Sequence, residues 1–178
     1  GGRDAFIGKL DSLFTADSKL EGESTSVDIS GLIGQYAHGN EPSHHIAHLY
    51  NYVGQPWRTQ EIVDEVLHTL YFNNPDGLSG NEDCGQMSAW YILNAMGFYQ
   101  VCPGKPVYSI GRPLFNEATV HLKDGKSFKV IAHNNSRDNK YVRSIVLNGN
   151  KLETPFFTHQ DIVDGGTLEL TMGSEPLK

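Results

Sequence analysis

The chain has 178 residues, of which 38% are hydrophobic and 20% are charged, and its formal net charge is -7. A chain of this size and composition can bury a core and is too apolar to be wholly disordered. The negative charge, without any run of Lys or Arg, argues against nucleic acid as a partner, and no apolar stretch approaches the roughly 20 residues that cross a bilayer.

Apolar residues at helical spacing predict helices in the first part of the chain. The predicted helices cover residues 4–14, 43–53, 56–72 and 85–96. Ser43 is the predicted cap of the second helix, because Pro42 disfavours a helical conformation at Glu41. Pro56 suits the first turn of the third helix, and Gly97 is a natural end for the fourth. Long polar loops between these segments predict helical hairpins.

From residue 104 onward, short alternating segments separated by turn residues predict strands. The predicted strands are 107–110, 118–122, 127–132, 142–147, 152–156 and 167–172. Residues 123–126 and the pair Asn148-Gly149 are predicted hairpin turns. The predicted fold class is therefore α+β, with helical hairpins in residues 1–103 and a small antiparallel β unit in residues 104–178.

Two polar loops, residues 36–45 and 76–87, lie directly before predicted helices. The N-terminus of a helix has unpaired N–H groups and the positive end of the helix dipole, which hold acidic side chains ionised. Helix capping is the alternative role for any one of these acids. Because amides and acids cluster in both loops, we predict that the loops approach each other and form one site.

Histidines and oxygen donors in the first loop suggest two kinds of metal site. His44 and His48 are four residues apart and could share a metal ion on a helix, but the segment lacks the Glu of the zinc-protease helix motif. Asn40 and Glu41 offer oxygen atoms, which suit a hard cation such as calcium. A helical zinc hydrolase therefore ranks last among the alternatives.

Several segments carry a resemblance to a known family. They include YAHGNEPSHHIAHLYNY at 36–52, GQPW at 54–57, DGLSGNEDCGQMSAW at 76–90 and GFYQVCP at 97–103. Together with shorter segments of the second half, they resemble, in the same order, the motifs of glycoside hydrolase family 92. The resemblance implies exo-acting, calcium-dependent α-mannosidases that invert the anomeric centre and are built from a β-sandwich domain and an (α/α)6 barrel.

The resemblance also implies roles for individual residues. It makes Asp83 the general base, with Glu82 as the alternative base, and it places the general acid, a Glu, upstream of this chain. We also predict substrate contacts for His38, His44, Asn81 and Gln86, and calcium contacts for Asn40 and Glu41. Trp57, beside Pro56 at a helix start, is predicted to line the sugar site, with a place in the core as the alternative. Asn81 stands where some members carry another Asp, which implies one carboxylate fewer beside the base and a less raised pKa of that base.

The predicted function is thus part of an exo-acting, inverting α-mannosidase of the α-1,2 type, with Ca2+ as cofactor and mannose-containing glycans as substrates. By the same resemblance, residues 1–103 are the last helices of the barrel, and upstream β-sandwich and barrel residues of the parent chain are their partners. The parent is expected to be a bacterial periplasmic, extracellular or cell-surface protein whose signal lies upstream of Gly1. The alternative is a non-catalytic carbohydrate-binding or interdomain module, in which the loop acids are helix caps.

Overall fold

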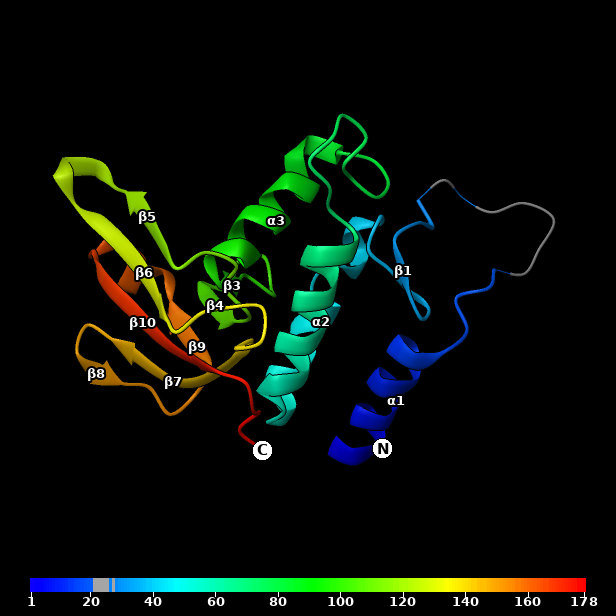
Figure 1. Ribbon diagram of the computed structural model, residues 1–178, viewed down its shortest axis with the longest axis horizontal. Coiled ribbons are helices and arrows are strands. Elements are labelled where there is room, and N and C mark those ends of the chain that lie inside the picture. Colours follow the sequence, from blue (N-terminus) through cyan, green and yellow to red (C-terminus); the bar gives the residue numbers. More distant parts are fainter. Residues whose placement is uncertain (21–25, 27) are drawn as a thin grey trace.

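The computed structural model describes residues 1–20, 26 and 28–178. Its α-helices are α1 (Arg3–Thr15), α2 (Pro56–Thr69), α3 (Gln86–Met96) and α4 (His159–Val163), and its 3₁₀ helices are η1 (Glu41–Ser43), η2 (Ile46–Val53), η3 (Asp83–Gly85) and η4 (Lys123–Gly125). Its strands are β1 (Leu32–Ile33), β2 (Tyr36–Ala37), β3 (Phe98–Tyr99), β4 (Val107–Ile110), β5 (Glu117–His121), β6 (Ser127–His133), β7 (Tyr141–Leu147), β8 (Asn150–Lys151), β9 (Phe156–Thr158) and β10 (Gly166–Gly173). Helices α1 to α3 lie on one side of the molecule and strands β5 to β10 on the other (Figure 1).

The helical part closes over an apolar cluster. Helices α2 and α3 lie side by side and form the predicted hairpin, and α2 also packs against η2 (Figure 1). Helix α3 ends where predicted, because Gly97 adopts a left-handed conformation with φ of 104°. The buried residues of this cluster are Leu10, Phe14, Ile33, Tyr36, Ala47, Tyr50, Val63, Val66, Leu67, Trp90 and Tyr99. The (α/α)6 barrel cannot be recognised from these helices and stays a prediction.

The prediction of an α-helix over residues 43–53 is wrong. Residues 41–43 and 46–53 form two 3₁₀ helices, and Ser43 ends η1 without capping anything. Side chains three residues apart eclipse each other in a 3₁₀ helix. His48 and Asn51 therefore lie close enough to share Ser109 of β4, at 3.1 Å from the ring Nδ1 of His48 and 2.6 Å from the amide nitrogen of Asn51. Tertiary hydrogen bonds outweigh the local preference for an α-helix here.

The β part contains a five-stranded sheet in the order β5-β6-β10-β7-β8. Hairpins join β5 to β6 and β7 to β8 at the two predicted turns, where Asp124 and Asn148 have positive φ. The expected antiparallel pairing holds except between β10 and β6, which are parallel. A parallel pair requires a long crossover. Here the crossover from β6 to β10 ends with β9 and α4, which follow β8 in the chain and lead into β10 beside β6.

A second sheet, in the order β3-β4-β9, connects the two parts of the molecule. It crosses the predicted boundary at residue 104, because β3 precedes that residue. The strand predicted at 152–156 is wrong: pairing in β9 starts only at Phe156, directly after Pro155, which has no N–H to donate.

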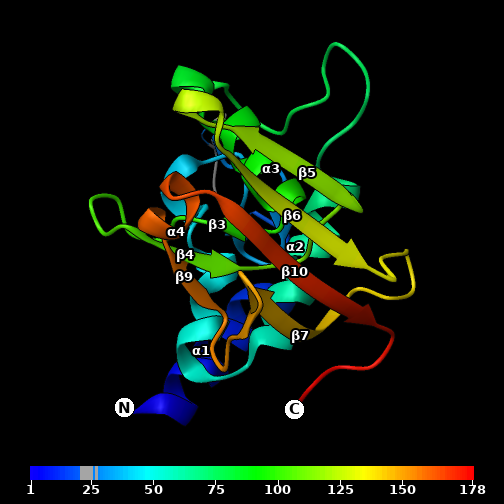
Figure 2. The same ribbon diagram turned by 90° about the vertical axis from the view of Figure 1, so that its left-hand side faces the viewer.

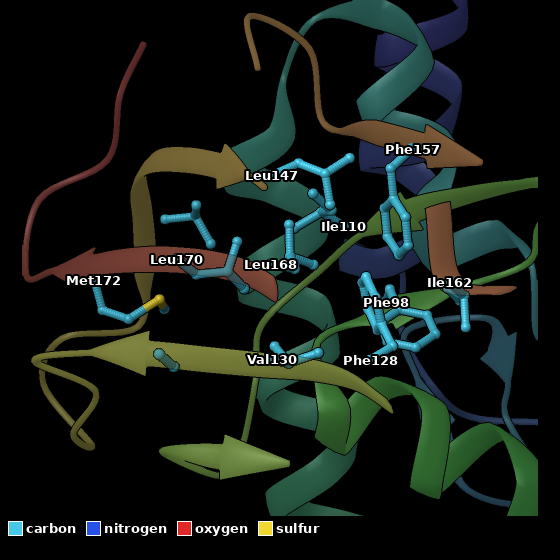
Figure 3. Close-up of a cluster of buried hydrophobic side chains, with 12 residues drawn as sticks. Phe98, Ile110, Phe128, Val130, Leu147, Phe157, Ile162, Leu168, Leu170 and Met172 are labelled. Atoms are coloured by element: carbon cyan, nitrogen blue, oxygen red, sulfur yellow. The ribbon is translucent and has the colours of Figure 1, made fainter. Parts of the chain in front are cut away.

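The main apolar core of the β part lies where the two sheets face each other. Figure 3 shows Phe98 and Phe157 of the small sheet pointing toward Phe128 of β6, with Leu168 and Leu170 of β10 beside them. Both leucines are fully buried. Figure 2 shows β10 running diagonally across this core between β6 and β7. None of the helices among the described residues combines the length and the apolar character that a membrane span requires.

Candidate active site

The two polar loops touch each other, as predicted, through a pair of glycines. Gly80 has φ of +89°, and a Cβ atom added to it would lie 2.5 Å from the carbonyl oxygen of Gly39. A Cβ atom on Gly39 would in turn lie 3.0 Å from the carbonyl oxygen of Ser79. The two backbones therefore meet without any side chain between them, which brings the start of η1 and the start of α3 to one place.

His38 lies inside the core and supports the first loop. The hydroxyl of Tyr71 donates to the carbonyl oxygen of Met87 at 3.1 Å, so it accepts from the ring Nε2 of His38 at 2.7 Å. The ring Nδ1 is then left to accept from the hydroxyl of Tyr36 at 2.8 Å. Burial, aided by His44, lowers the pKa of His38 to about 3, so the ring is neutral. With both nitrogens in use, the predicted contact of His38 with substrate does not fit its position.

His44 ties the first loop to the start of α3. Its Nε2 donates to the carbonyl oxygen of His38 at 2.9 Å, and its Nδ1 accepts from the amide nitrogen of Gln86 at 3.2 Å. The amide of Gln86 also donates to the hydroxyl of Tyr99 at 3.1 Å, which leaves its carbonyl oxygen as the atom without a partner among the described residues. Burial lowers the pKa of His44, in keeping with a neutral ring. Gln86 is thus held with one acceptor atom available to a ligand.

The three polar residues before α3 have different environments. The carboxylate of Glu82 accepts from the backbone N–H of Ser88 at 3.2 Å and from the Ser88 hydroxyl, so it caps the first turn of α3. The amide nitrogen of Asn81 donates to Asp28 at 2.8 Å. Asp83 is exposed in η3 and makes no side-chain hydrogen bond or ion pair within residues 1–20, 26 and 28–178. Of the two acids, only Asp83 is open to a water molecule on both carboxylate oxygens.

Glu41 has the features expected of a cation ligand. It lies in η1, and its Oε1 atom is buried without a hydrogen-bond partner among the residues that the structure describes. A buried, unpaired carboxylate oxygen is costly unless a positive charge neutralises it. Asn40, the preceding residue, is half-buried and adds an amide oxygen to the same turn. These oxygen donors fit a hard cation.

The structure gives no support to a zinc site at His44 and His48. The Nε2 atom of His48 donates to Asn94 at 2.8 Å, and its Nδ1 accepts from Ser109 at 3.1 Å. Its pKa is lowered to about 4 by burial, so the ring is neutral and fully occupied. In the described ranges, no group of three or more His, Cys, Asp or Glu side chains could hold a metal ion.

Trp57 lies far from the two loops. It belongs to the first turn of α2, whereas Tyr71, which contacts His38, follows the last turn of that helix. Since α2 has 14 residues, its ends are separated by about 21 Å at 1.5 Å per residue. The structure therefore brings His44, Asn81, Glu82, Asp83 and Gln86 together at one end of α2 and leaves Trp57 at the other.

Sequence reasoning missed the tyrosines that organise the site. Tyr36 precedes His38 by two residues, a spacing that puts both side chains on one face of an extended segment, so this pair was accessible from the sequence. Tyr71 and Tyr99 carry no such local signal, because their hydroxyls reach the histidine loop only through the tertiary fold.

Comparisons with known proteins agree on one family. The chain matches the Glycosyl hydrolase family 92 catalytic domain over residues 1–174. A family GH92 alpha-mannosidase from Bacteroides thetaiotaomicron is 44% identical with a TM-score of 0.89, and the match covers 99% of this chain and 23% of that one. The structure of that mannosidase in complex with mannoimidazole gives a TM-score of 0.92 over the same shares.

Two further relatives extend this picture. A family GH92 inverting mannosidase from the same bacterium is 43% identical with a TM-score of 0.83, covering 99% of this chain and 25% of that one. A protein named "uncharacterized secreted glycosidase" from Arthroderma benhamiae is 30% identical, in an alignment that covers 98% of this chain and 21% of that protein. The chain thus spans about a quarter of the length of its relatives. It belongs to glycoside hydrolase family 92.

Proposed function

We propose that this chain forms the C-terminal part of the catalytic domain of an exo-acting, calcium-dependent α-mannosidase that hydrolyses α-1,2-linked mannose with inversion. Family membership and the mannosidases among its relatives support the substrate class, and the relative described as inverting supports the stereochemistry. The observation that carries the proposal is the contact between the two loops, which brings Gln86 to 3.2 Å from His44 of the first loop and leaves Asp83 three residues before Gln86.

In an inverting mechanism, a base and an acid stand on opposite sides of the scissile bond, roughly 6.5 to 9.5 Å apart, with a water molecule beside the base. The exposed carboxylate of Asp83 takes a proton from that water as the water oxygen bonds to the anomeric carbon. The bond from this carbon to the leaving oxygen breaks, and the oxygen receives a proton from the Glu that the resemblance places upstream. Gln86 offers its carbonyl oxygen to a sugar hydroxyl.

Glu41, with Asn40 beside it, would hold the calcium ion. When bound, the ion supplies a fixed positive charge that orients sugar hydroxyls. The chain's own contribution is to keep Glu41 in place: His44 donates its Nε2 hydrogen to the carbonyl oxygen of His38 and so fixes the turn on which Glu41 lies. The secreted relative supports a periplasmic or extracellular location for the parent protein.

The test uses the full-length protein that carries this chain and follows α-1,2-mannobiose hydrolysis by NMR, with α-1,3- and α-1,6-mannobiose as comparisons. We expect β-mannose as the first product and the highest rate on the α-1,2 linkage. Early release of α-mannose would rule out inversion. Binding of mannobiose without any hydrolysis would favour a carbohydrate-binding module instead.

Substituting the base separates the two acids. Asp83→Asn should lower turnover by roughly 10²- to 10⁴-fold with little change in substrate binding, because a general base acts mainly on the transition state. Glu82→Gln should lower it far less, because a glutamine oxygen can still accept from Ser88. Equal losses for both variants, or a larger loss for Glu82→Gln, would assign the base to Glu82.

A further inference from the structure

We propose a second sugar site, separate from the two loops, in the pocket between the first turns of α2 and the β7–β8 hairpin, where it binds one pyranose ring of a mannose-containing glycan. The pocket has a volume of about 190 Å³ and is lined by Trp57 and Gln60 of α2, by Arg143 of β7, and by Lys151, Leu152 and Glu153 around the end of β8. The choice of mannose rests on the proposed function; the pocket and its chemistry do not.

Trp57 supplies the apolar wall of this pocket. Its side chain is half-buried and lines the cavity together with Leu152. Small-ligand sites combine such aromatic and apolar surface with a few polar groups that fix orientation. A pyranose has the matching surface, since its C–H groups form an apolar face and its hydroxyls point outward. Trp57 is also the residue for which the sequence suggested a sugar contact, and the structure gives it a pocket of its own.

Gln60 provides a fixed polar group in the wall of the pocket. Only 3% of Gln60 is exposed, and its side-chain oxygen accepts from the backbone N–H of Val142 at 3.1 Å. Its amide nitrogen makes no hydrogen bond in the described part of the chain, and Gln60 lines the pocket. This nitrogen is not sealed from solvent, so a sugar hydroxyl in the pocket can accept a hydrogen bond from it.

A bulge in β7 shapes the rim. The register between β10 and β7 shifts between Thr171, which pairs with Ser144, and Met172, which pairs with Val142, so Arg143 is the extra residue. Bulges redirect side chains, often at binding sites. The guanidinium of Arg143 is held by the carbonyl oxygen of Glu175 at 2.7 Å, which leaves further N–H groups for a ligand.

The rim matches a neutral ligand that both donates and accepts hydrogen bonds. Lys151 and Glu153 form an ion pair at 2.9 Å on the same rim as Arg143. Sugar hydroxyls can accept from the two cations and donate to the carboxylate, whereas a strongly charged ligand would meet one group of its own sign. A water molecule needs roughly 10–15 Å³ of such volume. The pocket therefore holds the several waters that one pyranose ring displaces.

The test measures binding of mannan by the full-length protein through its retardation in native gels that contain the polysaccharide. All proteins carry Asp83→Asn, so the polysaccharide is not consumed. Loss of one of two linked sites weakens polymer binding strongly. We expect Trp57→Ala to raise the apparent Kd for mannan at least about tenfold and Trp57→Phe, which keeps an aromatic ring, to raise it much less. The matched control is Phe115→Ala, at an exposed aromatic residue outside the pocket, and it should bind like the Asp83→Asn protein.

Arg143→Ala, on the exposed rim, tests the pocket without touching its apolar wall and decides alone if Trp57→Ala does not fold. If Trp57→Ala folds and its retardation by mannan is unchanged, the second site is overturned. If Trp57→Ala does not fold, unchanged retardation of Arg143→Ala overturns it. Either result would also be seen if other residues of the parent protein filled the pocket. Failure of the proposed function has a different signature. If the protein with native Asp83 shows no mannosidase activity, the proposed activity is refuted. If mannan retardation nevertheless depends on Trp57, the second sugar site stands.

Discussion

At the scale of single residues, the three buried histidines make stability depend on pH. His38 and His48 have folded-state pKa values of about 3 and about 4, against 6.5 without burial, and the pKa of His44 is also lowered. Below pH 6.5 the unfolded chain therefore binds more protons than the folded one. The part of the folding stability that depends on these neutral rings is fully present above pH 6.5, and it is lost as the pH falls toward 4.

We expect the free energy of unfolding to fall by up to about 1.4 kcal/mol per pH unit for each of these histidines. Urea titrations of the full-length protein at pH 7, 6, 5 and 4 measure this slope, with His48→Gln as the comparison that removes one titrating ring. A flat free energy between pH 6.5 and 4.5 would show that the buried rings are not held neutral.

A buried ion pair gives the second prediction at this scale. Asp64 of α2 and Arg112 are 6% and 2% exposed, and the guanidinium Nε lies 2.9 Å from the carboxylate. Arg112→Met leaves the carboxylate buried with weaker partners, so we expect a loss of about 3–5 kcal/mol in the free energy of unfolding. Lys129→Met, which breaks the exposed pair with Glu117 at 3.0 Å, should cost less than about 1 kcal/mol. Similar losses in denaturant unfolding would contradict the burial argument.

At the scale of elements, the contact between the loops can be tested with two glycines that share a backbone conformation. Gly80 and Gly104 have φ of +89° and +82°, so alanine carries the same backbone strain at both. Only Gly80→Ala also brings a Cβ to 2.5 Å from Gly39, because the surroundings of Gly104 are open. We expect Gly80→Ala to lower mannosidase turnover at least about tenfold, since small displacements of catalytic groups are costly, while Gly104→Ala keeps it. Equal activities would show that the loop contact does not position the site.

The long α-helices and most of the long strands followed from local sequence signals, and two of the differences have tertiary causes. Helix α4 was missed although its capping box, Thr158 with Asp161, is a local signal. The strand at 107–110 and the end of α3 at Gly97 were predicted correctly, because periodicity and capping are local. The 3₁₀ form of η2 was not, since it depends on Ser109, which lies 61 residues from His48. The parallel pairing of β10 with β6 likewise depends on where the chain returns after α4. For the site, the loops and their approach were predictable from the sequence, but the burial of His38 and the distance of Trp57 were not.

At the scale of the whole molecule, we expect the isolated 178-residue chain to release no aryl group from an activated aryl α-mannoside, with or without calcium. The chain spans about a quarter of its relatives' length, and the resemblance places the general acid upstream. General acid catalysis typically contributes about 10²- to 10⁴-fold, and the upstream walls of the sugar site are also missing. Calcium-dependent release above that of an Asp83→Asn control would locate a complete acid–base pair within these residues.

The same assay sample reports on the surface of the isolated chain. Phe6, Phe72 and Ile92, on or beside the three long helices, are 41%, 57% and 54% exposed. Apolar side chains exposed together favour association, so we expect the isolated chain to sediment partly as dimers or larger species at micromolar concentration. Phe72→Ser together with Ile92→Ser should shift it toward monomer, because both residues line one groove beside α3. A strictly monomeric chain without these substitutions would show that this groove does not require a partner, and the inactivity would then rest on the missing acid alone.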